Sequence, residues 1–260
     1  MKKNFPRNTT YKSILNPKYI SLHGFIISLP ETFDALGNTT VLRDIRNVIK
    51  RVTVAGEDLV IKKFARPSML NRFIYGRLRK SKAMRAYEYS LRLQKMGLHT
   101  PEPIGAIDTY HHGTISQSFY VSRYSQYNSL ECINHFMEHQ EQIKPLLNAL
   151  CELFITLHDA GVMYNDLNIL NILYKELPDG KYDFELIDTN RISFHTKLSK
   201  KQRIKDLSRL SCAPIPYCYL LQQYAKRMNY DADDFQLMGL FGRLLLHKRH
   251  LYKQRLKHDR

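Results

Sequence analysis

The chain of 260 residues lacks features that would assign it to several common classes of protein. It has no run of about 18 or more apolar residues, because Glu152 interrupts the most apolar segment, 146–157, so a membrane-spanning helix is not expected. The basic N-terminus has neither the apolar segment nor the small-residue cleavage site of a secretion signal. Internal repeats and low-complexity tracts are also absent. We therefore expect a cytoplasmic protein.

Cysteine is scarce as well. The four cysteines form no Cys-x-x-Cys pair, which excludes a disulfide scaffold or a zinc ribbon and predicts reduced thiols. They are Cys132, Cys151, Cys212 and Cys218. Hydrophobic residues make up 43% of the chain and charged residues 25%, so it can bury a substantial core. Its length allows one large domain or two lobes that share a cleft.

The formal charge of +16 is distributed unevenly. Residues 1–20 carry five bases and no acid, residues 61–100 carry eleven bases and only Glu88, and residues 241–260 carry seven bases and one acid. Residues 101–190 are opposite in sign, with four bases and thirteen acids. This distribution suits an anionic partner outside and metal cations inside. The alternative is a soluble surface on which lysines and arginines cluster by chance.

The N-terminal half is predicted to be a small β-rich lobe with one helix. Runs of β-branched residues flank Gly56 and two acids, which is typical of a hairpin, and Gly97 is a typical C-cap for a basic helix. The expected strands cover 45–54, 59–64, 104–107 and 118–124, and the expected helix covers 77–96. A polar linker at 125–129 begins where this lobe ends, which gives an N-terminal domain of residues 1–125.

The C-terminal half, residues 126–260, is predicted to be mainly helical. Apolar residues recur every three or four positions in 143–160, which indicates a buried amphipathic helix. After Gly161 the pattern indicates a loop that enters a strand, a turn at 178–180 and a returning strand at 182–188. Further helices are expected over 130–137, 198–210 and 216–257. The fold class is therefore α+β with two lobes.

Three polar residues lie among apolar neighbours in this half. Asp166 and Asn171 are five positions apart in the loop, and Asp188 ends the returning strand. Buried acids cost several kcal/mol unless a cation or a metal compensates them. Three oxygen donors brought together by a hairpin are typical of a hard-cation site, where Mg²⁺ takes a carboxylate, an amide oxygen and phosphate oxygens. Asp166 then faces an acceptor hydroxyl. A capped turn at Asp166 and Asn171 is the alternative.

This arrangement resembles the catalytic loop and metal-binding Asp of the protein-kinase-like superfamily. In Leu59-Val60-Ile61-Lys62 the lysine matches the residue that grips the α and β phosphates, and Glu88 lies where its helix partner is expected. More specifically, the chain resembles the lipopolysaccharide kinase family of the Kdo/WaaP type. The stretches that carry the resemblance lie within about residues 45–215 and are 59–64, 97–104, 157–162, 186–191 and 203–210.

The resemblance implies a bilobal protein-kinase-like fold and an ATP-dependent kinase that uses Mg²⁺. The γ-phosphoryl group would go to a sugar hydroxyl, Kdo or heptose, of the lipopolysaccharide inner core or a lipid A precursor. Lys62, held by Glu88, binds phosphates in this hypothesis, Asn171 and Asp188 hold the metal, and Asp166 is the catalytic residue. The alternatives are another phosphotransferase of the superfamily, either an atypical protein kinase or a small-molecule kinase, and a non-enzymatic protein that binds nucleic acid.

Two departures from the kinase pattern change the expected properties. Residues 46–54 contain no glycine, so the usual glycine-rich phosphate loop is missing. Lower nucleotide affinity, or a grip on phosphate by Lys50 and Arg51, would follow. Tyr164-Asn165 replaces the His-Arg before the catalytic Asp, so no arginine receives an activation-loop phosphate there. Neither loop phosphorylation nor a protein substrate is therefore expected.

The basic residues have two interpretations. Arg191, Arg203 and Arg209 either contact acceptor phosphates or pin the loop to its lobe. The tails and the basic helices are expected to bind an anionic membrane surface peripherally, at the cytoplasmic face of a Gram-negative inner membrane. The densest group is Lys248, Arg249, Lys253, Arg255 and Lys257. The alternative is a helix that only keeps the protein soluble. No specific nucleic acid and no obligate protein partner are expected.

Overall fold

The computed structural model describes residues 9–67 and 79–258, with side chains up to residue 255. The chain divides into two compact units. Unit 1 ends at Gln126 and also contains Asp188–Asn190, and unit 2 consists of Tyr127–Ile187 and the chain from Arg191 onward. The division lies one residue after the expected domain boundary. The inclusion of Asp188–Asn190 in unit 1 was not expected.

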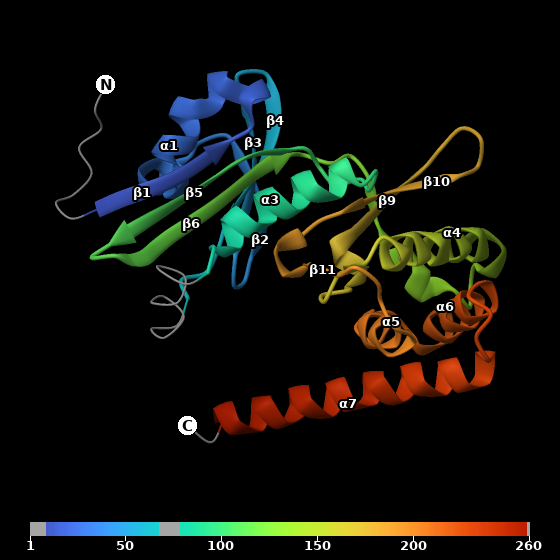
Figure 1. Cartoon of the computed structure of the whole chain (residues 1–260). Helices are drawn as coiled ribbons and strands as arrows, with labels where there is room; N and C mark the ends of the chain where they lie inside the picture. The colour runs from blue at the N-terminus through green and yellow to red at the C-terminus, as the bar shows by residue number, and fades with distance from the viewer. Residues whose placement is uncertain (1–8, 68–78, 259–260) are drawn as a thin grey trace. The chain divides into compact units, whose positions relative to one another are not determined.

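Unit 1 is built on a six-stranded antiparallel sheet with the spatial order β1-β5-β6-β4-β3-β2 (Figure 1). Its strands are β1 (Thr9–Leu15), β2 (Thr39–Asp44), β3 (Val48–Val54), β4 (Glu57–Lys63), β5 (Pro103–His111) and β6 (Thr114–Arg123). β1 pairs with β5 along its whole length. The described part of the expected basic N-terminal tail therefore belongs to the sheet as far as Leu15.

The predicted hairpin is formed by β3 and β4, with a tighter turn than expected. Ala55 and Gly56 connect the strands with φ of 52° and 80°, and Val54 already pairs with Glu57. Positive φ at both central positions is typical of the two-residue turn that matches the twist of a hairpin. The turn fixes the register of β4.

Different helices cover the two faces of the sheet. One face packs on α1 (His23–Thr32) and on the 3-10 helices η1 (Pro17–Leu22) and η2 (Phe33–Ala35), and its core includes Leu59 and Ile61. The other face packs on α3 (Lys82–Lys95) through a smaller cluster that includes Phe64 and Tyr87. The Ser81 side chain caps the start of α3, and Gly97 follows its end with φ of 76°. Residues 77 and 78 of the expected helix lie outside the described residues.

Unit 2 combines short strands with helices. The predicted hairpin is formed by β9 (Ile172–Glu176) and β10 (Tyr182–Leu186), and β7 (Asn128–Ser129) pairs with β9. A second short pair joins β8 (Val162–Met163) and β11 (Ser193–Phe194). The 3-10 helices are η3 (Leu130–His135), η4 (Ile169–Asn171) and η5 (Thr189–Arg191), which begins in unit 1, and the α-helices are α4 (Gln140–Asp159), α5 (Lys200–Leu207), α6 (Pro214–Arg227) and α7 (Ala232–His258).

The core of unit 2 lies between α4, α6 and the start of α7. The apolar positions of α4 predicted to be buried include Leu147, Leu150 and Phe154, and all three are fully buried. The Tyr224 ring of α6 stacks on the Phe235 ring of α7 with 5.4 Å between their centroids. All four cysteines are free thiols. Within residues 9–67 and 79–258, no helix is long and apolar enough to cross a membrane.

Candidate active site

Lys62 and Lys63 are neighbours on β4 but lie on opposite faces of the sheet. Lys63 Nζ is 2.8 Å from Asp34 Oδ2, on the face that α1 and η2 cover. Lys62 lies on the α3 face, where its Nζ is 5.1 Å from the centroid of the Phe64 ring. Successive strand residues point to opposite faces, so the alternation along β4 accounts for this placement.

In unit 1, the ammonium group of Lys62 pairs with the carboxylate of Asp188. Nζ and Oδ2 are 2.7 Å apart, and only 12% of the lysine side chain and 25% of the aspartate side chain are exposed. The other oxygen, Oδ1, accepts a hydrogen bond from the Asn190 side-chain amide. Asp188 has a φ of 59°, an uncommon conformation for a residue other than glycine. Two of the predicted site residues are therefore brought together here.

Buried hydroxyl groups attach this segment to α3. The Thr189 hydroxyl donates to the Ala86 carbonyl oxygen at 3.1 Å and lies 3.0 Å from Ser90 Oγ. The Tyr120 hydroxyl on β6 donates to the same Ser90 oxygen at 3.3 Å. Ser90 and Thr189 are both buried. These neutral hydrogen bonds hold the residue next to Asp188 against the helix and the sheet.

Glu88 does not pair with Lys62, which corrects the sequence-based expectation. Glu88 Oε1 is 2.6 Å from Lys80 Nζ, and Lys62 pairs with Asp188 instead. The reason is the rotation of α3, which buries Ser90 and leaves the Glu88 side chain 33% exposed. The spacing along the sequence placed an acid on the correct helix but could not fix the side of the helix on which it lies.

Lys50 and Arg51 do not form the expected basic phosphate grip either. Lys50 is buried, and its Nζ donates to the Phe33 carbonyl oxygen at 2.7 Å. Arg51 forms an ion pair with Asp58, with Nη2 and Oδ2 2.6 Å apart. The connection between β2 and β3 is the three-residue segment 45–47, which contains no glycine.

In unit 2, a buried carboxylate organises the loop that carries Asp166. Asp206 lies on α5 next to the buried Leu207, and 1% of its side chain is exposed. Its two oxygens accept hydrogen bonds from the backbone amides of Tyr164 and Asn165, each at 2.7 Å. Hydrogen bonds to a charged acceptor are roughly twice as strong as neutral ones, so Asp206 fixes the backbone immediately before Asp166.

A polar chain continues behind Asp206. His158 Nε2 is 3.5 Å from Asp206 Oδ2, and His158 Nδ1 is 2.7 Å from the Tyr224 hydroxyl. Arg203 donates to that hydroxyl at 3.1 Å and pairs with Asp159 at 2.7 Å. Burial raises the pKa of Tyr224, so its hydroxyl keeps its proton at neutral pH. Arg203 was expected either to contact acceptor phosphates or to hold the loop to its lobe. Its contacts with Tyr224 and Asp159 support the second interpretation.

The side chains around Asp166 hold its orientation. Arg191 Nη1 is 3.2 Å from Asp166 Oδ1. Asn165, with φ of 65°, donates from its side-chain amide to the carbonyl oxygens of Met163 and Arg191 and, at 2.8 Å, to Ser193 Oγ. The residue that replaces the arginine of protein kinases therefore joins the two short strands on either side of the loop.

Asn171 is oriented by its own loop. Its side-chain Nδ2 donates to the Asp166 carbonyl oxygen at 3.1 Å, which directs Oδ1 away from that carbonyl. Its backbone carbonyl accepts from the Ile187 amide at 2.9 Å, and the Tyr164 hydroxyl donates to the Ile187 carbonyl oxygen. Asp188 is the next residue along the chain.

A protein-family model matches most of the chain. It is described as "Lipopolysaccharide kinase (Kdo/WaaP) family" and covers residues 40–225. The chain belongs to this lipopolysaccharide kinase family. It is therefore a kinase, and its family supports an acceptor in the lipopolysaccharide core.

The comparison with solved structures supports the fold of this lipopolysaccharide kinase. The chain is similar to the structure titled "WaaP in complex with acyl carrier protein", with a TM-score of 0.56, 18% identity and coverage of 93% of this chain and 98% of that chain. At this identity the likeness establishes the fold alone, and it confirms the expected α+β kinase-like architecture. No curated protein matches the chain.

Sequence reasoning missed two groups that position the site of this lipopolysaccharide kinase. Asp206 had a signal that could have found it, since it is an isolated acid between Ile204 and Leu207 on a helix. A buried acid in such a place needs hydrogen-bond donors. Ser90 and Thr189 had no comparable signal, because hydroxyl residues occur throughout the chain and their pairing joins positions 99 residues apart.

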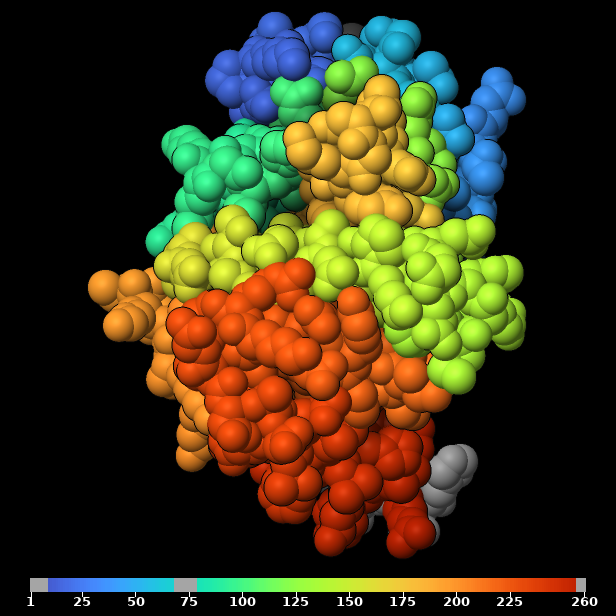
Figure 2. All heavy atoms as spheres, turned by 90° about the vertical axis from the view of Figure 1, so that its right-hand side faces the viewer, coloured from blue at the N-terminus to red at the C-terminus, as the bar shows by residue number. Residues whose placement is uncertain are grey.

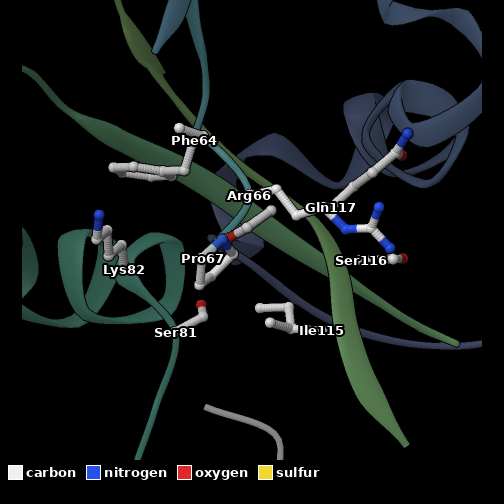
Figure 3. Close-up of a pocket in the computed structure, with 10 residues that line it drawn as sticks. Phe64, Arg66, Pro67, Ser81, Lys82, Ile115, Ser116 and Gln117 are labelled. Atoms are coloured by element: carbon white, nitrogen blue, oxygen red, sulfur yellow. The ribbon is translucent and has the colours of Figure 1, made fainter. Parts of the chain in front are cut away.

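Unit 1 contains a pocket that is too small to hold the nucleotide that would donate the phosphoryl group. It lies where β4 ends and α3 begins, and Phe64, Arg66, Ser81 and Lys82 are among its lining residues (Figure 3). Its volume is ≈ 10 Å³, which is room for about one water molecule. A nucleotide therefore cannot bind inside it.

Proposed function

We propose that this kinase transfers the γ-phosphoryl group of ATP to a sugar hydroxyl, of Kdo or heptose, in the lipopolysaccharide inner core. The observation that carries the proposal is the 2.7 Å pair of Lys62 and Asp188, a cation and an anion held on the α3 face of the sheet. The lysine suits phosphate oxygens and the carboxylate suits a hard metal ion. Family membership supports the lipopolysaccharide acceptor.

The donor atoms suit Mg²⁺ that arrives together with a nucleotide. In the described part of the chain, no group of three His, Cys, Asp or Glu residues could hold a metal by itself. Mg²⁺ is commonly bound by one or two protein oxygens plus substrate phosphates, so the Asp188 carboxylate and Asn171 Oδ1 suffice in this proposal. Bound there, the ion would neutralise charge on the phosphates. Because Ile187 is hydrogen-bonded to Asn171 and precedes Asp188, chain connectivity supports a shared ion.

Asp166 is the proposed catalytic residue. Its carboxylate accepts a hydrogen bond from the acceptor hydroxyl and orients that oxygen towards the γ-phosphorus. Phosphoryl transfer relies mainly on positioning and charge neutralisation. A carboxylate held in a fixed position therefore contributes to the rate even though it is not a strong base. The ion pair with Arg191 and the Asp206 hydrogen bonds to the preceding amides support this role, because both restrict how Asp166 can move.

A phosphate-transfer assay tests the proposal. Asp166→Ala and Asp188→Ala should each lower transfer by about a thousandfold, whereas Asp179→Ala, in the β9–β10 turn, should not. The assay uses deep-rough lipopolysaccharide, ATP and Mg²⁺, with mass spectrometry to detect one added phosphate. Circular dichroism checks that each variant is folded. Wild-type activity in either folded site variant would overturn the assignment of roles, and phosphate transfer only to a different acceptor would overturn the substrate.

The protein is also proposed to act at the cytoplasmic face of an inner membrane. The acceptor carries acyl chains and anionic groups, and attraction to an anionic leaflet is worth about 1 kcal/mol per Lys or Arg near the surface. The bases of α7 from Lys248 to Lys257 are the candidates. The similar structure is titled as a complex of WaaP with acyl carrier protein, so a protein of that kind is a second candidate partner.

A further inference from the structure

The C-terminal helix α7 has two unlike faces. Near the start of the helix, its inner face packs on the rest of unit 2, and Phe235 is fully buried there. Two glycines allow this close approach, because a Cβ on Gly239 would lie 2.5 Å from Leu221 Cδ1 and one on Gly242 would collide with Ser208 Oγ. The Tyr217 hydroxyl donates to the Gly239 carbonyl oxygen at 3.1 Å. One side of α7 is therefore fixed against the protein.

The outer face of α7 is apolar and exposed. Leu237, Phe241 and Leu244 recur at spacings of four and three residues, so they lie on one side of the helix. Their exposed fractions are 69%, 60% and 66%. Among the α7 side chains that the structure describes, the large exposed apolar ones are Leu237, Met238, Leu240, Phe241, Leu244, Leu245, Leu251 and Tyr252. Clusters of large exposed apolar side chains are typical of interaction sites.

The second half of α7 projects beyond the helices on which the first half packs. Figure 1 shows α7 continuing past α5 and α6, and every residue from His247 to Arg255 is exposed. Figure 2 shows the first turns of α7, in red, at the surface of unit 2. Helices in water gain most of their stability from packing. A projecting segment that exposes Leu251 and Tyr252 would therefore be stabilised by a surface that covers these side chains.

The charges on α7 indicate which kind of surface its outer face would bind. Its acids, Asp233 and Asp234, are confined to the first turn, and from Phe235 to His258 the sequence contains only basic charges. Lys248 and Arg255 follow Leu244 by four and eleven residues and therefore share its face. Two copies of this face would bring like charges together, which disfavours a dimer through α7. Basic and apolar side chains together suit an anionic lipid interface.

We propose that the outer face of α7 inserts its apolar side chains into the interfacial region of an anionic bilayer. This inference deepens the proposed peripheral binding and rests on it. Attraction by charge alone is screened by salt within a Debye length, whereas burial of apolar area is not. Binding by α7 therefore has a salt-sensitive part from its bases and a salt-resistant part from Leu237, Phe241 and Leu244.

The absence of tryptophan from the chain provides a direct test, because one introduced tryptophan is the only one present. In Phe241→Trp, vesicles of phosphatidylglycerol and phosphatidylcholine should shift the emission to shorter wavelength and protect the ring from a water-soluble quencher. Ile45→Trp is the matched control, since Ile45 is 83% exposed on unit 1. An unchanged Phe241→Trp spectrum with protein that sediments with the vesicles would overturn insertion and leave charge-driven binding intact.

Substitutions then measure the apolar contribution. Leu237→Ser combined with Leu244→Ser should weaken vesicle binding at high salt by about tenfold or more, because two large apolar side chains no longer leave water. Ile20→Ser combined with Ile45→Ser removes exposed apolar residues of unit 1 and should leave binding unchanged. Phosphate transfer to a water-soluble acceptor should remain at the wild-type level in both double variants, which separates this inference from the proposed kinase chemistry. Equal loss of vesicle binding in both double variants would overturn the assignment to α7.

An acyl carrier protein arm tests the competing occupant. Purified acyl carrier protein is added to Phe241→Trp without vesicles, and the emission is recorded. No change supports the lipid surface. A shift with the carrier protein, without a shift with anionic vesicles, would overturn the proposal and assign this face to a protein partner.

Discussion

The two units hold their parts of the site by different means. In unit 1, Asp188 is kept beside Lys62 by its ion pair and by neutral hydroxyl contacts through Thr189. In unit 2, the loop before Asp166 is held by a carboxylate that accepts two backbone amides. A neutral hydrogen bond contributes about 0.5–1.5 kcal/mol and one to a charged group about 1.5–3 kcal/mol. The ion pair of Asp188 is itself charged, so the weaker contacts of unit 1 are those of Thr189, which are expected to be easier to disrupt than the hydrogen bonds of Asp206.

Within this comparison, the largest effect is expected in unit 1, where substitutions of the neighbours Lys62 and Lys63 on β4 should differ in outcome. Lys62→Ala should lower transfer by about a hundredfold and reduce the stabilisation by ATP and Mg²⁺, since it removes a phosphate-binding cation. Lys63→Ala should change neither, because its partner Asp34 lies on the opposite face. A thermal-shift titration with ATP and Mg²⁺ compares the two. Equal shifts in both variants would contradict the assignment of Lys62 to the site.

The second effect tests the rigid half of the comparison. Asp206→Asn replaces one carboxylate oxygen by an amide donor, so one of the two loop amides loses its acceptor. We expect a loss of about 2 kcal/mol in the free energy of unfolding and a lower kcat, with little change in the KM for ATP. Urea unfolding and steady-state kinetics measure both. A raised KM with unchanged kcat would show that Asp206 supports the nucleotide half instead.

The smallest effect tests the softer half. Thr189→Val keeps the shape of the side chain but removes its hydrogen bond to the Ala86 carbonyl, at a cost of about 1 kcal/mol. Because Thr189 is next to Asp188, we expect weaker stabilisation by ATP and Mg²⁺ and a raised KM for ATP. Thr189→Ser restores the hydroxyl and should recover most of both. If the serine variant behaves like the valine variant, the hydroxyl is not what positions Asp188.

The β4 strand shows what the sequence could predict. Alternation along Leu59 to Lys63 was sufficient to separate Lys62 from Lys63, because side chains in a strand have only two directions. The apolar repeat of α4 and the turn at Pro178-Asp179-Gly180 also predicted elements that the structure confirms. Each of these signals is local, so a short window of sequence contains it.

The parts that were missed depend on distant partners. β1 carries little alternation and is mostly exposed, so nothing in Thr9–Leu15 signals that it pairs with β5. The pairing of Glu88 with Lys80 depends on how α3 rotates against the sheet, which spacing does not specify. Asp206 was visible as an isolated acid, but its partners are backbone amides about forty residues earlier, a distance that no local pattern encodes.

The assignment of Asp188–Asn190 to unit 1 has a consequence for dividing the protein. The chain passes from unit 1 to unit 2 after Gln126, returns at Asp188 and leaves again after Asn190. A protease cut after Gln126 would therefore release an N-terminal fragment without the aspartate that pairs with Lys62. The other fragment would carry Thr189 without the helix that buries it. The N-terminal fragment lacks part of unit 1, and the C-terminal fragment carries that part together with unit 2, so one cut in the chain cannot separate the two units.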